Sequence, residues 1–319
     1  MLRFRPFRNI DPPAYTQLWR SISGSPGYAQ PVSVDLFEQF VFGKLHFEYP
    51  GLIFAFDDDR PVGFVHASFG YEHRRGWLDR SIGVIAIVVT RPDARSPALI
   101  SGLLERAEEH LVRGGATTIY AGSHRPHCPF YVGLYGGADV AGILESEAEV
   151  HAELRQRGYE VVQQVDAFRR ELASFQPPMD RQQLQCRRRM LVQVLVEPPL
   201  HNRWEAVTLG DFDLTRFELV PRGGSGPMAY ALVRDMMLGD GSYAGRTAAV
   251  LELETTPAAR RQGLATFLLS EAFRMLANQG FTQIEAHASG EIPATRQLLN
   301  KLGFARTAGG TVYRKRLAT

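Results

Sequence analysis

Cysteine is scarce in this sequence. Cys128 and Cys186 are the only two among 319 residues. A secreted scaffold held together by several disulfides needs more cysteines than this, and two isolated thiols suit a reducing compartment. The composition therefore excludes a disulfide framework and favours a cytoplasmic protein.

Long hydrophobic runs are also missing. The most apolar stretch, Ile82 to Val89, is much shorter than the roughly 20 residues that a membrane-spanning helix needs. The first residues, Met1 to Pro6, alternate apolar and basic side chains and lack the apolar core of a signal peptide. We expect no membrane partner, and we interpret Ile82 to Val89 as a buried strand.

Neither sign of charge dominates. The sequence has 36 lysines and arginines against 34 aspartates and glutamates, which gives a net charge of +2. A balance of this kind creates no strong field for nucleic acid. Arg187 to Arg189 form one basic run, which we interpret as a solvated stretch before a strand at Met190 to Val196. We expect no nucleic-acid partner.

Potential metal ligands do not form a complete set. His124, His127 and Cys128 share one loop but lack a fourth ligand, and Asp57 to Asp59 lack the later ligands of a calcium loop. We therefore expect no metal. The loop follows a central strand, at the end where α/β sheets place their sites, so contact of His124, His127 or Tyr131 with a substrate stays open.

The sequence does contain a strand, a turn and a helix in direct succession. Ala248 to Thr255 are predicted to form a strand because apolar and acidic residues alternate at its end. Pro257 stops that strand. Arg260 to Ala265 then lead into an amphipathic helix, whose apolar residues are spaced three or four apart and which Gly280 is expected to end.

A helix start of this kind can hold a phosphate group. The first N–H groups of a helix have no acceptor within the helix, and the helix dipole favours an anion beside them. Gly263 lets the backbone approach the phosphate closely, and Ala265 is nearly as small. Arg260 and Arg261 add positive charge of a shape that matches phosphate oxygens.

The segment Arg260-x-x-Gly263-x-Ala265 after a strand resembles the pyrophosphate loop of the GNAT superfamily of N-acyltransferases. The order of the following elements, and Leu302-Gly303-Phe304 before a final strand at Thr311 to Arg316, are similar to the second half of the GNAT fold. The resemblance implies acetyl-CoA as co-substrate. The cofactor-binding residues that it implies are Thr255, Arg260, Arg261, Gln262, Gly263, Leu264, Ala265 and Thr266.

The same succession of elements occurs twice, near residues 82–121 and 248–286. We therefore expect an α/β (α+β) fold made of two tandem GNAT-like domains, each with a mixed central sheet flanked by helices. The predicted parts are a degenerate domain at 1–175, a linker and strand at 176–200, and a domain with an intact loop at 201–319. Glu160 to Glu171 are expected to close the first domain as one or two strands.

The first copy departs from the loop pattern. Arg95 matches the leading arginine, but Ala98 stands in the place of the glycine and Ile100 in the place of the small residue. Pro97 has no N–H to donate. We expect this copy to bind CoA poorly and to have a structural role. The second copy has room at 204–220 for strands but not for the two helices that begin the first.

The resemblance also implies roles in acyl transfer. A backbone N–H of Thr255 or Glu254 would face the thioester carbonyl, and Glu252 or Glu254 would be the catalytic base, although these two could also be an ordinary solvent-facing pair. The tyrosine that the family often uses as acid is replaced by Leu299. The remaining candidates for an acid are His287, Ser289, Tyr243, Tyr131 and water.

The function expected from these residues is an N-acetyltransferase that acts on a primary amine of a small acceptor by direct attack. The alternative is a non-catalytic acyl-CoA-binding or regulatory protein, which the missing tyrosine favours. A dinucleotide-binding enzyme does not fit, because no Gly-x-Gly-x-x-Gly follows a strand. The acceptor stays open, and so does the choice between a monomer and a homodimer.

Overall fold

The computed structural model describes residues 1–72, 77–224, 226–236, 238 and 245–317. We call residues 1–175 the first half and 176–319 the second half. The first half begins with a strand and two helices and continues with a strand hairpin, a long strand, a helix and a short strand. These elements are β1 (Leu2–Pro6), α1 (Pro12–Ser21), α2 (Val34–Phe37), β2 (Leu52–Asp57), β3 (Arg60–Glu72), β4 (Trp77–Thr90), α3 (Pro97–Arg113) and β5 (Thr118–Ala121).

A π-helical turn at Glu38–Phe42 extends α2. The first half ends with β6 (Ile143–Leu144), α4 (Ala148–Gln156) and β7 (Glu160–Glu171). The second half repeats this order with fewer helices at its start. Its elements are α5 (Arg181–Arg189), β8 (Met190–Val196), α6 (Arg203–Leu209), β9 (Leu214–Pro221), β10 (Ala229–Met236), β11 (Thr247–Thr255), α7 (Leu264–Asn278), β12 (Gln283–Ser289), α8 (Pro293–Lys301) and β13 (Ala305–Arg316).

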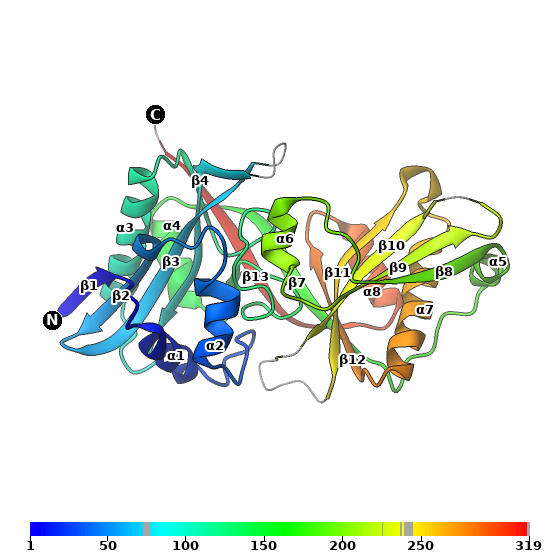
Figure 1. The fold of residues 1–319 in the computed structure, drawn as a ribbon, viewed down its shortest axis with the longest axis horizontal. Helices are drawn as coiled ribbons and strands as arrows, with labels where there is room; N and C mark the ends of the chain where they lie inside the picture. The colour runs from blue at the N-terminus through cyan, green and yellow to red at the C-terminus, as the bar shows by residue number, and fades with distance from the viewer. Residues whose placement is uncertain (73–76, 225, 237, 239–244, 318–319) are drawn as a thin grey trace.

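All the strands belong to one continuous sheet (Figure 1). Its order is β1-β2-β3-β4-β5-β13-β7-β12-β11-β10-β9-β8, and β6 pairs with β13. The pairs β4–β5 and β11–β12 are parallel and are the crossovers that α3 and α7 connect. The two halves therefore lie side by side along one sheet, each with the same internal strand order.

The last strand of each half is exchanged with the other half. β13, the final strand of the chain, pairs with β5 of the first half, and β7 pairs with β12 of the second. The two exchanged strands also pair with each other along most of their length. Glu160 to Glu171 thus form a strand, as expected, but it extends the sheet beside β12 instead of closing the first half. The division of the chain into domains at 1–175 and 201–319 stays a prediction.

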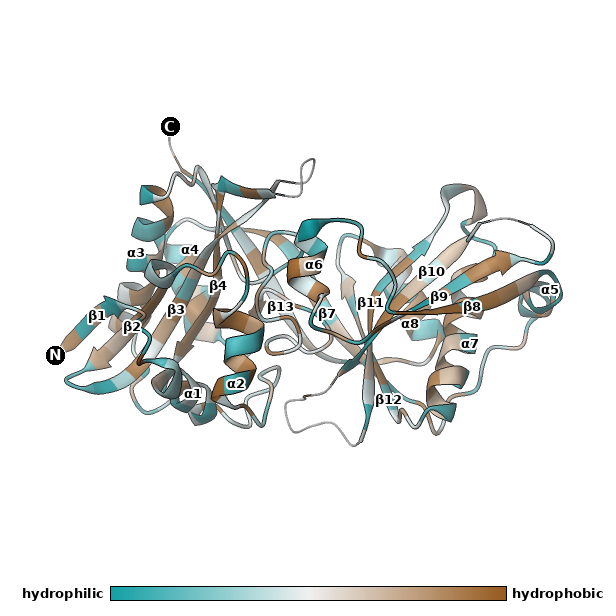
Figure 2. Ribbon diagram, viewed as in Figure 1, coloured by the Kyte–Doolittle hydropathy of each residue, from teal (hydrophilic) through white to brown (hydrophobic). Residues whose placement is uncertain are grey.

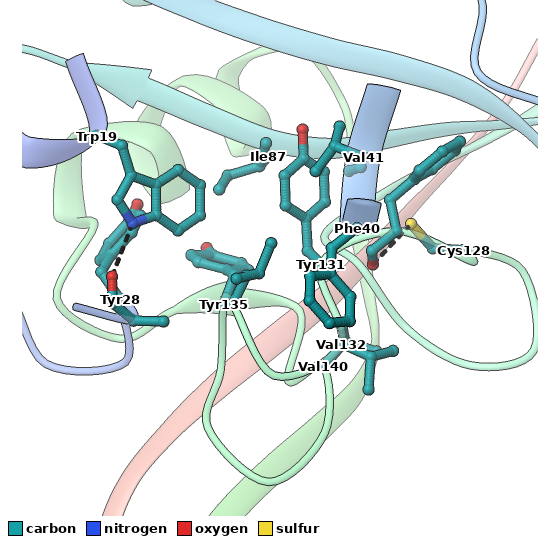
Figure 3. Close-up of a cluster of buried hydrophobic side chains, with 14 of the residues drawn as sticks. Trp19, Tyr28, Phe40, Val41, Ile87, Cys128, Tyr131, Val132, Tyr135 and Val140 are labelled. Atoms are coloured by element: carbon teal, nitrogen blue, oxygen red, sulfur yellow. Dashed lines mark hydrogen bonds between the residues drawn. The ribbon is translucent and has the colours of Figure 1, made fainter. Parts of the chain in front are cut away.

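Buried side chains form three clusters, of which one reaches across both halves. That cluster contains Tyr15 and Trp19 from α1 as well as Leu214, Ala249 and Leu251 from the second half. Its aromatic centre is drawn in Figure 3, where the Trp19 indole N–H donates to the carbonyl oxygen of Ala29 at 3.0 Å. The halves consequently share a hydrophobic core, in addition to the sheet.

Helix α7 covers one face of the sheet in the second half. α7 packs on β9, β10 and β11, and its buried residues include Leu268, Leu269 and Phe273. Ile82 to Val89 lie within β4, and Val84 to Val89 are buried, as the run of apolar residues predicts. Arg187 to Arg189 are exposed directly before β8, as expected of a solvated stretch, and they form the last turn of α5. The front of the second half holds one short helix, α6, besides its strands.

Candidate active site

The predicted phosphate loop connects β11 to α7. A 3-10 turn at Pro257–Ala259 is followed by Arg261 and Gly263, whose φ angles are +64° and +74°. Gly263 is the N-cap residue of α7, and no side-chain hydrogen bond within the described part of the chain caps this helix. The N–H groups of residues 261–266 have no hydrogen-bond acceptor among the described residues. A loop of free amides at a helix start is an anion-binding arrangement.

Helix α5 fixes this loop from one side. The side-chain amide of Gln182 donates to the carbonyl oxygen of Arg261 at 3.3 Å, and that of Gln183 donates to the carbonyl oxygen of Gly263 at 3.2 Å. The thiol of Cys186 lies 3.7 Å from the carbonyl oxygen of Gln262. Since α5 contacts the carbonyl oxygens of the loop, the N–H groups of the loop stay available to a ligand.

Gly263 is required here for two structural reasons. Its φ of +74° is one that other residues rarely adopt, and a Cβ atom at this position would lie 2.7 Å from Cδ of Gln182. Sequence reasoning missed the contact with α5. The signal for that helix was Asp180, whose side chain accepts a hydrogen bond from the N–H of Gln183 as an N-cap.

Two arginines bring positive charge to the loop. The guanidinium of Arg260 donates to the carbonyl oxygen of Thr255 at 3.3 Å, and Arg260 is exposed. Arg261 lines a pocket of about 250 Å³ between the loop, α5 and the start of β8, together with Arg189. The remaining residues around this pocket are Gln182, Gln185, Cys186, Met190, Met228, Gln262 and Leu264.

β11 and β12 separate beside the loop. Their pairing ends at Val250 and Ala286, although β11 continues to Thr255. A β-bulge lies at this point, because Val250 and Glu252 pair with adjacent residues of β10 and leave Leu251 without a partner there. The sheet therefore opens along the last five residues of β11.

The main-chain groups of β11 that face this gap can be identified. The N–H of Thr256 donates to the carbonyl oxygen of Met228 at 2.9 Å, which directs the main chain of Thr256 toward the β10 side. Antiparallel strands alternate in this respect. The main chains of Glu252 and Glu254 hence also point to β10, whereas those of Leu253 and Thr255 point into the gap. Of the two residues expected to face a thioester carbonyl, Thr255 has the suitable orientation.

Glu252 and Glu254 lie on the face of the sheet opposite α7. The hydroxyl group of Tyr230 lies 3.4 Å from the Glu252 carboxylate and donates to it. Burial of Tyr230 raises the pKa of its phenol to about 12, and the negative charges of Glu252 and Glu254 add a smaller effect in the same direction. A pocket opens on this face beside Glu252. It is lined by Pro198, Leu200, His201, Glu205, Arg216 and Tyr230, among others.

An arginine of the first half reaches this site. The guanidinium of Arg125 donates to the carbonyl oxygen of Leu251 at 2.8 Å and to the Glu252 carboxylate at 3.2 Å. It also forms an ion pair with Asp139 at 2.7 Å. Burial alone would lower the pKa of Arg125, but the two carboxylates outweigh burial and raise it. Sequence reasoning missed this contact, because no local pattern relates residues 125 and 252.

The corresponding loop of the first half is closed by its own side chains. The Ser96 hydroxyl caps α3 by accepting from the N–H of Leu99, at 3.3 Å, and Pro97 has no N–H. The main chain after β5 stays bonded to β4, since the N–H of Ser123 donates to the carbonyl oxygen of Ala86, whereas the corresponding carbonyl oxygen of Leu251 accepts from the side chain of Arg125. Ala86 is the bulge residue of β4 and corresponds to Leu251 of β11.

The other residues suggested as acids or substrate contacts are placed as follows. Leu299 is buried on α8, in the cluster under α7. Tyr131 is fully buried in the shared core (Figure 3), and its hydroxyl is bonded to Tyr15 and His66. His124 is buried and contacts the carbonyl oxygen of Gly122. Tyr243 lies outside the described residues.

His287 is the candidate acid nearest to the gap. It lies on β12, just beyond the last residue that pairs with β11, and it is fully enclosed next to Glu285 and Asp139. Burial lowers its pKa below the ordinary value despite these carboxylates. Ser289 lies two residues further, where its hydroxyl accepts from the Gln163 side chain at 3.2 Å.

Two further properties concern the described part of the chain. No group of three or more histidine, cysteine, aspartate or glutamate side chains within it is arranged to hold a metal ion. No helix within it combines the length and the apolar character needed to cross a membrane.

Comparisons with solved structures reveal the same fold. A GCN5-related N-acetyltransferase from Sphaerobacter thermophilus has a TM-score of 0.67 at 15% identity, over 100% of this chain and 96% of that one. A tandem GNAT protein from the clavulanic acid biosynthesis pathway has a TM-score of 0.67 at 12% identity, over 100% and 99% of the two chains. These identities are low, so the likeness supports the fold alone.

A third structure is similar over part of its length. It is a GCN5-related glucosamine N-acetyltransferase region in a fungal multi-domain β-N-acetylglucosaminidase, with a TM-score of 0.72 at 15% identity. The alignment covers 99% of this chain but 38% of the fungal one. A search of curated protein sequences finds no match.

The sequence itself matches the acetyltransferase (GNAT) family over residues 13–134 and 196–304, which is well over half of the chain. One match falls in each half, and the tandem neighbour aligns along the whole length. The predicted fold class, two GNAT-like units in tandem, is confirmed. The chain therefore belongs to the acetyltransferase (GNAT) family, and by that membership it is an acyl-CoA-dependent acyltransferase.

Proposed function

We propose that the protein is an N-acetyltransferase whose working site lies in the second half. One observation carries this proposal: the free N–H groups of residues 261–266 stand beside the gap that opens after Val250 and Ala286. In the first half Ser96 caps the corresponding helix, and the main chain of Ser123 stays bonded to β4. An anion cradle beside an open strand gap suits a long ligand with a diphosphate at one end and a thioester at the other.

The residues around the loop fit acetyl-CoA as co-substrate. The amides of residues 261–266 would hold the pyrophosphate, with Arg260 and Arg261 adding charge at the rim. Thr255 would direct its N–H toward the thioester carbonyl, because its main chain points into the gap. Bound in this way, acetyl-CoA would supply an activated acetyl group to the face of the sheet that carries Glu252.

The reaction would be a direct transfer. Glu252 takes a proton from the acceptor ammonium, and the free amine attacks the thioester carbonyl carbon. A carbon–nitrogen bond forms and the carbon–sulfur bond breaks. The thiolate leaves with the electron pair of that bond and takes a proton from water or from a neighbouring group. Glu254 lies on the same face and is the second candidate for the base.

The face of the sheet beside Glu252 would receive the acceptor. The pocket there brings Glu205 and Glu252 together with Arg216 and with the apolar side chains of Leu200 and Leu232. The two carboxylates would attract the ammonium group of a small primary amine to this face, while the pocket itself, of about 10 Å³, has room for about one small polar group. The acceptor end of the site would thus lie opposite α7, while the co-substrate would enter at the loop.

A specific observation also supports the alternative, a non-catalytic acyl-CoA-binding or regulatory protein. The candidate base Glu252 is already engaged by Arg125, and the family's tyrosine is replaced by the buried Leu299. In that case the cradle would bind acyl-CoA, but no acceptor would be acetylated.

Turnover separates the two functions. Purified protein is incubated with acetyl-CoA and a panel of polyamines, amino acids, amino sugars and peptides with a free N-terminus, and free thiol is measured over time. We expect amine-dependent thiol release with at least one class, and mass spectrometry should detect the acetylated product. Binding of acetyl-CoA without release for any class would favour the regulatory alternative.

A further inference from the structure

Strand β8 forms one margin of the sheet. Its seven residues pair with β9, and no other strand among the described residues pairs with it (Figure 1). The opposite margin is β1. An edge strand offers unpaired main-chain groups to any chain that can approach, so proteins usually protect it with charge, proline or a covering segment.

The two margins differ in their protection. β1 has the sequence Leu-Arg-Phe-Arg-Pro, which places Arg3, Arg5 and Pro6 along the edge. β8 has the sequence Met-Leu-Val-Gln-Val-Leu-Val, without a charge or a proline, and it is largely brown in Figure 2. Leu191, Val194 and Val196 are 42%, 44% and 73% exposed. β8 is therefore an apolar edge that lacks the usual protection.

The outward main-chain groups of β8 can be identified from its hydrogen bonds to β9. The N–H of Glu197 donates to the carbonyl oxygen of Leu214 at 2.9 Å, and the carbonyl oxygen of Arg189 accepts from the N–H of Arg222 at 2.7 Å. Alternation along the strand then directs odd-numbered residues toward β9. Val192, Val194 and Val196 direct their N–H and C=O groups away from the sheet.

We propose that β8 pairs antiparallel with β8 of a second copy of this chain, so that one sheet continues through a homodimer. A two-fold axis at Gln193 sets Val192 opposite Val194 of the other copy, and both present outward main-chain groups. The same axis sets Leu191 opposite Leu195, which joins apolar side chains on the other face. Each apolar residue of β8 then lies opposite an apolar residue of the other copy, and Gln193 lies opposite Gln193.

Charge complementarity selects this register. With the axis at Gln193, Arg189, which directly precedes β8, comes beside Glu197 of the other copy, which directly follows its β8. Moving the axis by one residue, to Val192 or Val194, keeps outward main-chain groups paired but sets Arg189 opposite Leu195 or Pro199. The occupant is a second copy because the edge is complementary to itself in sequence, main-chain direction and charge.

A cysteine cross-link tests both the contact and its register. In this arrangement the two Gln193 residues form a non-hydrogen-bonded pair with their Cα atoms about 4.5 Å apart, within the range that a disulfide spans. The matched control is Leu191→Cys, because the two copies of residue 191 would be about 14 Å apart along the strand. The native Cys128 and Cys186 are buried. We expect mild oxidation to link Gln193→Cys into a covalent dimer and to leave Leu191→Cys unlinked. Equal linking of the two variants, or none, would overturn the proposal.

Sedimentation provides the second test. We expect the wild type to sediment with the mass of two chains, and Val194→Lys, which places a charge on the edge, to sediment with the mass of one. Val161→Lys is the control, because Val161 is 48% exposed but lies on β7 inside the sheet. Circular dichroism spectra establish that each variant is folded. A monomeric wild type at all concentrations, or a dimeric Val194→Lys, would contradict the proposal.

The proposed pairing of Arg189 and Glu197 allows a rescue experiment. Arg189→Glu and Glu197→Arg should each weaken the dimer at least tenfold, because like charges then face each other at both ends of the strand pair. The double variant restores opposite charges and should recover the wild-type dissociation constant to within about threefold. A double variant as weak as the singles would overturn the register.

Discussion

At the scale of single residues, Glu252 and Glu254 differ in their surroundings. Glu252 is held by Arg125 and by the Tyr230 hydroxyl, whereas Glu254 is exposed at the same face. A general base must keep a defined position relative to the amine, and the fixed carboxylate meets this condition better. Arg125 thus orients Glu252 in addition to neutralising part of its charge.

Exchanging each carboxylate for an amide tests this assignment. We expect Glu252→Gln to lower kcat by about 10²- to 10⁴-fold, the usual contribution of a general base. Glu254→Gln should change kcat by no more than a few fold. Steady-state kinetics with the best acceptor of the panel measure both. A large loss in Glu254→Gln with little change in Glu252→Gln would move the base to Glu254.

Two buried histidines make the stability depend on pH. Burial lowers the pKa of His124 to about 4 and that of His66 to about 3, from the ordinary 6.5. Between these values and 6.5 the unfolded chain binds protons that the folded protein does not bind. The free energy of unfolding should therefore fall as the pH decreases below 6.5, by about 1.4 kcal/mol per pH unit for each histidine.

Urea unfolding between pH 7.5 and pH 5 measures this slope. His124→Gln removes one titrating group, so the slope of its unfolding free energy should be smaller by about one proton. A slope identical to that of the wild type would show that His124 is protonated in the folded protein.

At the scale of elements, α5 and the loop act as one unit. Three side chains of α5 contact successive loop carbonyl oxygens, so the conformation of the free amides depends on that helix. The N-terminus of α3, the helix of the first half that corresponds to α7, is instead capped by the side chain of Ser96. The capping residues of α5 and α3 therefore provide a matched pair for mutation.

Removing either cap should have different consequences for ligand binding. Asp180→Ala removes the cap of α5, and Ser96→Ala removes the cap of α3, each at a cost of about 1 kcal/mol in stability. Only Asp180→Ala should weaken acetyl-CoA binding, by several fold, because it loosens the loop. Thermal melting and calorimetric titration measure the two effects. Equal weakening in both variants would show that the loss follows global stability rather than the loop.

Local patterns in the sequence predict the loop but not its surroundings. Proline, glycine and the alternation in Ala248 to Thr255 are local signals, and they indicated β11, the turn and α7 correctly. The contact between Arg125 and Glu252 joins residues 127 positions apart, and it depends on how the two halves pack. The exchange of β7 and β13 is likewise invisible locally, because either strand would pair equally well with its own half.

At the scale of the whole molecule, the halves depend on each other. β13 lies between β5 and β7, and Lys44 of the first half donates to the carbonyl oxygen of Val207 at the end of α6, and contacts Asp211 at 3.0 Å. Arg234 of β10 donates to the carbonyl oxygen of Ala138 at 3.0 Å. The two halves are thus joined by the sheet and also by side-chain contacts.

Separating the halves should therefore abolish folding. We expect fragments 1–175 and 176–319, expressed alone, to lack a cooperative unfolding transition, because each exposes a sheet edge and part of the shared core. The two fragments expressed together should associate and recover acetyl-CoA binding. Calorimetric melting and size-exclusion chromatography measure this. A cooperative transition in either isolated fragment would contradict the dependence.

The most direct test of the central claim is a calorimetric titration with acetyl-CoA, which reports both affinity and stoichiometry. The account predicts one site per chain in the wild type. Gly263→Trp should abolish binding by filling the cradle, while Ala98→Trp, at the equivalent place in the first half, should leave both affinity and stoichiometry unchanged. Two sites per chain, or loss of binding in Ala98→Trp alone, would contradict the assignment of the working site to the second half.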